Sequence, residues 1–218
     1  MRIYRIIFLI LSSFILFTSC GTFCCLNKQK LLNNIDVSNY SILEKKYNSL
    51  LFKANIKALG NDYTGLIFIK YFASDSSIHI VFISELGLNL FDFKYKSDKF
   101  EVVTCKDFFN KKQIINILQS DFRSIVQDLS KIETNKISIK EVNDFKILKF
   151  IHLSDKYFYF YRSNFDVFRI YKKAGFFKTI NVSIVKNSED LLDSINISHS
   201  RIRLSINLKL IKVQNNAN

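Results

Sequence analysis

Apolar and polar positions alternate from Leu51 to about residue 105, with the period of two that is typical of β-strands. In the first run Phe52, Ala54 and Ile56 share one face, and lysine or asparagine stands between them. Polar turn sequences then separate four more strands, LIFIKYF (66–72), IHIVFIS (78–84), LNLFDFKY (88–95) and FEVVTC (100–105). Five successive strands with short turns predict an antiparallel meander.

The period changes after this meander and indicates an amphipathic helix of about 20 residues over 110–129. The apolar residues that recur there at helical spacing are Ile114, Leu118, Phe122 and Ile125. Asn110, with Gln113 three positions later, matches the capping-box pattern at the start of this helix. Residues 31–50 and 188–195 carry shorter helical patterns, so we expect two or three helices in all.

Alternation returns after the helix in KISIK (136–140), FKILKFI (145–151), KYFYFYR (156–162), FRIYKK (168–173), KTINVSIV (178–185) and RIRLSINLKLIKV (201–213). A long sheet with one apolar face curls rather than staying flat. The sequence therefore predicts a mainly β, α+β fold, in which a curled antiparallel sheet holds the amphipathic helix inside the curl as a plug. A closed barrel, and a sheet with its helices packed on the outside, are the alternatives.

The N-terminus predicts a lipoprotein signal peptide. Arg2 and Arg5 precede an apolar run over 6–17, which is shorter than the roughly 20 residues of a membrane-spanning helix. LFTSCG (16–21) resembles a bacterial lipobox, in which Cys20 receives the lipid after cleavage of residues 1–19. Several acyl chains on Cys20 would anchor the protein firmly to a membrane. No aspartate follows Cys20, so we expect the outer membrane, facing the periplasm.

These patterns divide the chain into a signal peptide (1–19), a lipidated tether (20–30), a single domain (31–213) and a disordered tail (214–218). The length that remains after cleavage is enough for one domain with a proper core. The formal net charge is +13. Because the lysines are scattered between apolar residues, we expect a solvated surface rather than a nucleic-acid site.

Nothing in the sequence indicates catalysis, a metal or a cofactor. The cluster of Cys20, Cys24 and Cys25 has no zinc-site spacing. Cys24 and Cys25 are either idle thiols or, in an oxidising periplasm, one of them is a partner for Cys105. The three histidines are far apart, and no serine–histidine–aspartate pattern, HExxH or phosphate-binding loop is present. Gly65 and Gly87 stand at strand borders, where glycine permits bends.

Three short segments carry a family resemblance: Glu85-Leu86-Gly87, Phe91-Asp92-Phe93-Lys94, and Ser120-Asp121-Phe122-Arg123. With the strands around them, they resemble the LolA/LolB-like lipoprotein-carrier superfamily, and in particular small LolB-like outer-membrane lipoproteins. The resemblance covers roughly residues 50–125. It implies a half-open antiparallel barrel with a helical lid and an apolar interior that accepts acyl chains.

The resemblance also implies a function and a set of candidate residues. The protein would bind an acyl chain or a lipidated protein, in lipoprotein or lipid trafficking. The alternative is an adaptor lipoprotein of an envelope complex, with its interior filled by its own side chains. The candidate cavity-lining residues are Phe91, Phe93, Leu118, Phe122, Ile125 and Tyr159.

Two further features bear on this function. The tyrosines of YFYFY (157–161) share one face of a strand, either as ordinary core or as a pocket wall. The family also carries an apolar residue on a protruding loop that helps to deliver cargo. The hairpin tips GNDYTG (60–65) and ASDSS (73–77) offer at most Tyr63 for this role, which weakens the case for delivery even if the fold is as expected.

Overall fold

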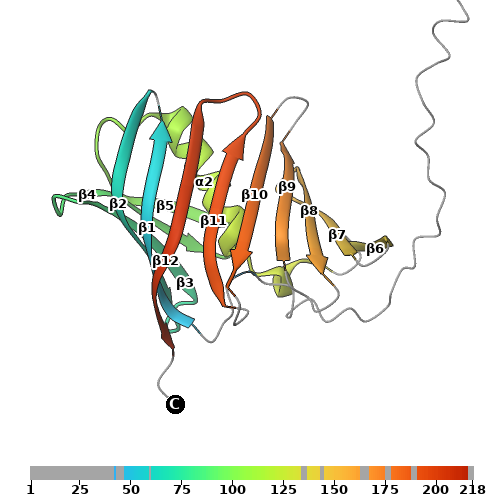
Figure 1. Cartoon of the computed structure of the whole chain (residues 1–218). Coiled ribbons are helices and arrows are strands. Elements are labelled where there is room, and N and C mark those ends of the chain that lie inside the picture. The colour runs from blue at the N-terminus through green and yellow to red at the C-terminus, as the bar shows by residue number, and fades with distance from the viewer. Residues whose placement is uncertain are drawn as a thin grey trace, which may run out of the picture.

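The computed structural model describes residues 42, 47–58, 60–133, 137–142, 145–162, 167–174, 178–187 and 191–215. In these parts of the chain, twelve strands form one sheet that is accompanied by a single α-helix and a short 3-10 helix (Figure 1). The strands are β1 (Tyr47–Ala58), β2 (Asn61–Phe72), β3 (Ser77–Ser84), β4 (Asn89–Lys96), β5 (Lys99–Cys105), β6 (Ile137–Val142), β7 (Phe145–His152), β8 (Asp155–Arg162), β9 (Val167–Ala174), β10 (Lys178–Lys186), β11 (Leu192–His199) and β12 (Leu204–Asn215). The helices are α2 (Lys112–Val126) and η2 (Leu129–Lys131).

Two antiparallel meanders meet in the middle of this sheet. The strand order is β5-β4-β3-β2-β1-β12-β11-β10-β9-β8-β7-β6, so β1 and β12 pair at the centre while β5 and β6 are the two edges. All the pairs are antiparallel. The prediction of a five-stranded meander followed by a second set of strands is confirmed.

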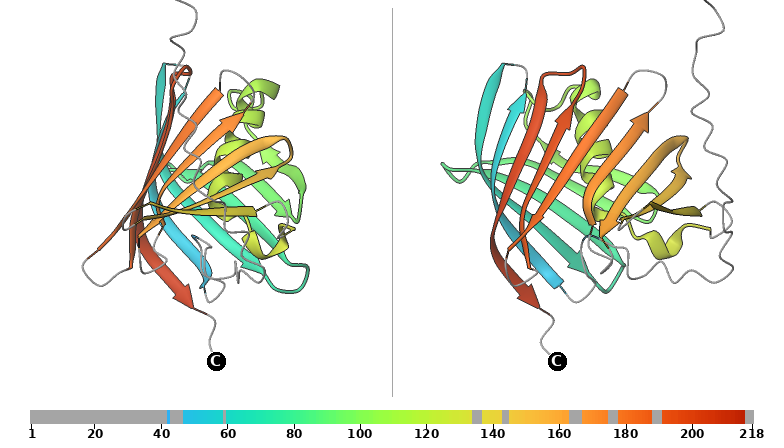
Figure 2. Two further views of the ribbon diagram at one scale, coloured as in Figure 1. Left: turned by 90° about the vertical axis from the view of Figure 1, so that its right-hand side faces the viewer. Right: turned by 45° about the vertical axis from the view of Figure 1, so that its right-hand side comes forward.

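The sheet curls, and α2 lies on its concave side (Figure 2). Because β5 precedes α2 and β6 follows it, the chain crosses from one edge of the sheet to the other through this helix. Since the two edge strands do not pair within the described residues, the sheet is open and not the closed barrel of the alternative. The helix lies inside the curl, as the sequence predicts.

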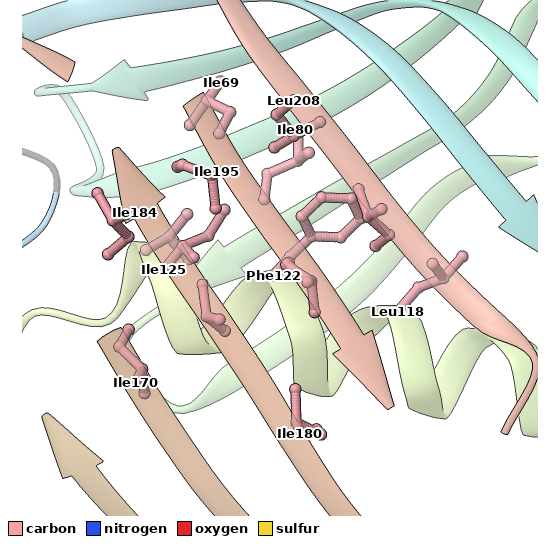
Figure 3. Packing of buried hydrophobic residues seen from close by; sticks show 14 of the residues in the cluster. Ile69, Ile80, Leu118, Phe122, Ile125, Ile170, Ile180, Ile184, Ile195 and Leu208 are labelled. Atoms are coloured by element: carbon pink, nitrogen blue, oxygen red, sulfur yellow. The ribbon is translucent and has the colours of Figure 1, made fainter. Parts of the chain in front are cut away.

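The core fills the space between α2 and the concave face. Inward positions of the strands alternate with outward ones, as in β1, where Leu50, Phe52 and Ala54 are at most 2% exposed. Leu118, Phe122 and Ile125 of α2 point into the curl toward isoleucines and leucines of the strands (Figure 3). Each such side chain, when fully buried, contributes about 1.5–3 kcal/mol of hydrophobic free energy. This burial fixes which face of the sheet is inside.

Two predicted helices are wrong where the described residues allow a comparison. β1 begins at Tyr47, so the helix expected over 31–50 is wrong for residues 47–50; nearly all of its other residues lie outside the described ones. β11 occupies Leu192–His199, where the end of a short helix was expected. Ile195 and Ile197 are buried there, and a strand buries both on one face.

The predicted capping box is also wrong. Helix α2 has Lys111 as its N-cap residue, and no side chain caps it. Asn110 instead lies in a turn, where its backbone N–H donates to Lys106 O at 2.9 Å. Because Asn110 lies in this turn, the helix begins after the residue that the capping pattern requires as its N-cap.

Gly65 marks the closest approach of two strands. It lies opposite Ser84 in the β2–β3 pair, and a Cβ at this position would overlap the carbonyl group of Ile83. Gly87, by contrast, has open space around it and a φ of +77°, which belongs to the turn between β3 and β4. The two glycines are therefore needed for different reasons.

We expect Gly65→Ala to lower the free energy of unfolding by about 2 kcal/mol or more, because backbone must move to admit the methyl group. Gly87→Ala is the matched control and should cost about 1 kcal/mol, since only the left-handed backbone is strained. Chemical denaturation of both variants measures the difference. Equal losses would contradict the close approach of β2 and β3 at Gly65.

Candidate functional site

The six candidate lining residues come together between α2 and the sheet. Phe91 and Phe93 lie on β4, Tyr159 on β8, and the other three on α2; all six are at most 1% exposed. The Phe91 and Phe93 rings stack with centroids 4.3 Å apart, and Phe91 lies 5.9 Å from the ring of Phe122. The Tyr159 hydroxyl donates to Ser124 O of α2 at 2.8 Å. Their role in lining a lipid cavity stays a prediction.

The tyrosines of YFYFY all point inward. Tyr157, Tyr159 and Tyr161 are at most 1% exposed, and the Tyr157 ring stacks on Phe150 at 4.9 Å. The phenylalanines between them are half-buried on the outer face. The tyrosines are thus part of the core beside the C-terminal half of α2.

A buried ion pair ties α2 to β11, and sequence reasoning missed it. His199 Nε2 lies 3.0 Å from Asp121 Oδ1, and His199 Nδ1 lies 2.8 Å from Leu204 O. The side chains of Asp121 and His199 are 0% and 4% exposed. Both imidazole nitrogens face oxygen acceptors, so the geometry favours the doubly protonated imidazolium, which donates to both.

Burial and the partner charge act in opposite directions on this pair. Burial raises the pKa of Asp121 above its ordinary value, although His199 opposes the shift. Burial alone would lower the pKa of His199, but the hydrogen bond and charge of Asp121, aided by Leu204 O, hold it above its ordinary value. The second carboxylate oxygen of Asp121 is buried without a hydrogen-bond partner in the structure. The ion pair is thus fixed at one oxygen only.

A second buried cation ties α2 to β8 and β9. Lys172 of β9 is 1% exposed; its Nζ lies 2.7 Å from Asp155 Oδ2 and donates to Ser120 Oγ of α2. Burial lowers the pKa of Lys172, while the hydrogen bond and charge of Asp155 oppose the shift. Lys172 Nζ thus joins a carboxylate of β8 to a hydroxyl of α2.

Arg123 makes the third tie, to the hairpin between β4 and β5. Its guanidinium donates to Asp98 O at 3.1 Å and to Ser97 O at 3.4 Å, and it lies over the Tyr95 ring at 5.4 Å. The Tyr95 hydroxyl in turn donates to Gln119 O at 3.1 Å. The C-terminal half of α2 is therefore held by polar contacts to both halves of the sheet.

A hairpin tip carries the apolar side chains that sequence analysis sought elsewhere. Tyr63 is partly buried and stacks on Phe108 at 5.1 Å, so it is no protruding apolar residue. The tip between β3 and β4, which extends to the left in Figure 1, instead exposes Leu86 and Leu88 by 87% and 55%. The turn at Gly87 brings these two leucines to the surface. Sequence reasoning considered two other tips for this role and missed the tip between β3 and β4.

The cysteine predictions remain mostly untested. Cys20, Cys24 and Cys25 lie outside the described residues. Within those residues Cys105 has a free thiol, and burial raises its pKa. In the same part of the chain, no three histidine, cysteine or carboxylate side chains gather as metal ligands. Nor is any described helix long and apolar enough to cross a membrane.

Comparison with known proteins gives distant similarities only. No protein-family model matches the sequence, and no curated protein matches it. Among solved structures, a DUF1329 family protein from Desulfovibrio piger shares 11% identity at a TM-score of 0.44, over 80% of this chain and 88% of the other. A proposed outer membrane lipoprotein-sorting protein domain from Vibrio parahaemolyticus shares 10% at 0.45, over 78% and 85%. The Mycobacterium tuberculosis lipoprotein LppX shares 10% at 0.26, over 80% and 90%. Similarity at these scores transfers neither a function nor a ligand.

The Asp121–His199 pair predicts a pH-dependent stability. Because the pKa of His199 is raised in the folded protein, its contribution is complete below 6.5, the ordinary histidine value, and is lost as the pH rises through the raised pKa. We expect His199→Gln to remove this component of the pH slope. The variant should also lose about 3 kcal/mol near neutral pH, because the Asp121 carboxylate stays buried without its cation.

Chemical denaturation from acidic to alkaline pH tests this expectation. His79→Gln is the matched control, since His79 also lies beside a carboxylate, 3.1 Å from Asp92, but on the outer face. The double variant Asp121→Leu with His199→Leu should recover much of the lost stability, because it removes both buried charges. A wild-type slope that equals the slope of His199→Gln would contradict the ion pair.

Proposed function

We propose that the protein is a lipid-anchored carrier of the cell envelope, which binds an acyl chain or a lipidated protein between its curled sheet and α2. The observation that carries this proposal is the position of α2. Its apolar face closes the concave side of an open sheet whose two edge strands are joined through this helix. In this proposal α2 is the element that moves, and it separates the apolar interior from the surroundings.

The contacts of α2 support reversible docking. Its apolar side chains would be replaced by the methylenes of an acyl chain at little cost in hydrophobic free energy. Its polar ties, by contrast, contribute little net stability, because desolvation of Asp121 and Lys172 offsets their attraction. A helix held in this way has one defined position, and it can leave this position when another apolar group fills the interior.

The β3–β4 tip supports a role in delivery. Leu86 is 87% exposed, which makes it the most exposed of the large hydrophobic side chains in the described residues. The family resemblance assigns such a protruding apolar residue to the transfer of cargo into the membrane. Together with the predicted anchor at Cys20, this tip would contact the bilayer that receives the cargo.

A structural adaptor is the second candidate. The direct ring contacts between Phe91, Phe93 and Phe122 favour it, because they fill the interior with the protein's own side chains. An adaptor would use its surface and bind no lipid. The two candidates therefore differ in whether α2 releases the interior to a ligand.

Native mass spectrometry distinguishes the two functions. We expect the chain from Gly21 onward to bind a diacylated lipopeptide, and Phe122→Glu to weaken binding by at least about tenfold, because a carboxylate would face the acyl chain. Ile211→Glu is the control, since Ile211 is 55% exposed on β12. Circular dichroism checks that Phe122→Glu folds; if it does not, Phe93→Leu tests the same contact. An unliganded mass at every lipopeptide concentration would support the adaptor.

Transfer of the bound lipopeptide to vesicles tests the delivery tip. We expect Leu86→Glu to keep the affinity for the lipopeptide and to slow its transfer about tenfold, because the leucine no longer enters the bilayer. Ile211→Glu again serves as the control. An unchanged transfer rate in Leu86→Glu would show that the tip is not used.

A further inference from the structure

The outer face of β7, β8 and β9 combines apolar side chains with cations. Inward positions of these strands are buried, so the positions between them form the outer face. Its exposed or half-buried apolar residues include Phe145, Ile151, Phe158, Phe160, Phe168 and Tyr171. Its exposed cations are Lys149, Lys156, Arg162, Arg169 and Lys173. We call this surface the aromatic–basic face.

Strand register places apolar groups and cations side by side. Lys149, Phe158 and Tyr171 form one row across the three strands. Ile151, Lys156 and Lys173 form another. Within the first row the Phe158 and Tyr171 rings are 6.0 Å apart, and Lys149 Nζ lies 6.0 Å from the Phe158 ring centroid.

Lys156 and Lys173 share a row of the described strands that contains no carboxylate. Asp155 is the only carboxylate in the three strands, and it pairs with the buried Lys172. Lys156 and Lys173 lie directly opposite each other, although like charges in that position destabilise a strand pair. An anionic partner would relieve the repulsion between them.

The tip of the β7–β8 hairpin adds an apolar group where the backbone disfavours it. Leu153 has a φ of +48° and is 56% exposed. Asparagine and glycine are the usual residues at such a turn position. Leucine there costs stability, and more than half of its surface remains exposed. Beside it, Ile151 is 47% exposed at the end of β7.

We propose that the aromatic–basic face, with the Leu153 tip, docks on the surface of an anionic lipid bilayer. Phosphate headgroups would pair with the five cations, while Leu153, Ile151 and Phe145 would enter the boundary between headgroups and acyl chains. A nucleic acid matches the charge but offers no place for exposed aliphatic side chains. The 26 residues between Cys20 and Tyr47 would let a lipid-anchored protein turn this face to its membrane.

Two variants separate docking from folding, because each should stabilise the fold while weakening membrane binding. Lys156→Glu replaces a like-charge pair with an opposite-charge pair against Lys173. It should lower the affinity for anionic vesicles about tenfold, since one attractive charge becomes repulsive. Leu153→Asn suits the left-handed turn and should lower the affinity by about tenfold through the lost apolar contact.

Co-sedimentation of the chain from Gly21 onward measures the affinity, with vesicles of phosphatidylcholine alone or mixed with phosphatidylglycerol. Lys53→Glu is the matched control, because exposed Lys53 lies opposite Lys209 on the outer face of β1 and β12. Binding that needs phosphatidylglycerol, weakens with salt, and is lost in the two variants but kept in the control supports the proposal.

Three results would overturn this proposal: equal binding to both kinds of vesicle, an equal loss in Lys53→Glu, or tighter binding to a short RNA duplex at the same salt concentration. The vesicles contain no lipopeptide and the face lies outside the interior. Failure here would therefore leave the carrier proposal standing, and failure to bind lipopeptide would leave membrane docking standing.

Discussion

The fold depends on the position of one helix, α2, inside an open sheet. Twelve strands present a continuous apolar face, and among the described elements α2 is the α-helix that covers it. Hydrophobic burial drives this contact but is nondirectional, so it does not determine the rotation or the depth of the helix. The polar contacts of Asp121, Arg123 and Ser120 supply that information. Each reaches a different part of the sheet, and together they define one position for α2.

These contacts suit specificity better than stability. Removing Asp121 and Lys172 from water costs free energy that their partners only partly return. Aliphatic contacts alone would hold α2 without this cost in desolvation free energy, but they would also allow the helix to slide among similar positions. The protein thus combines a strong, unspecific apolar contact with weak, directional ties. That combination gives α2 one defined position on the concave face of the sheet.

The sequence predicted the sheet well because alternation reports burial directly. The meander of β1 to β5, the later strands apart from β11 and the apolar stripe of α2 follow from side chains that face one core. β11 was missed because Glu189 and Asp190, which precede it, suit the first turn of a helix, and only two isoleucines mark its inner face. The start of β1 was missed for a similar reason, since Tyr47 and Leu50 also fit a helical spacing.

The polar ties were harder to predict because their members are distant in the chain. Asp121 and His199 are separated by 78 positions, and Lys172 and Ser120 by 52. A signal was nevertheless present in the pattern. Asp121 falls on the apolar stripe of the helix, three positions after Leu118 and four before Ile125. Lys172 and His199 likewise occupy inward positions of their strands. Each follows a buried isoleucine, Ile170 or Ile197, by two positions. A charge at a core position predicts a buried partner, but only the fold identifies that partner.

Strand β8 shows how one sequence can serve two surfaces at once. Its tyrosines face inward, where Tyr159 uses its hydroxyl to bind the backbone of α2. Its phenylalanines face outward, away from α2, so they need no hydroxyl to bind the helix. Exchange of the two residue types would leave the alternation of the strand intact while removing the tie to Ser124. The apolar pattern thus determines that β8 is a strand, and the choice between tyrosine and phenylalanine determines which of its faces holds the helix.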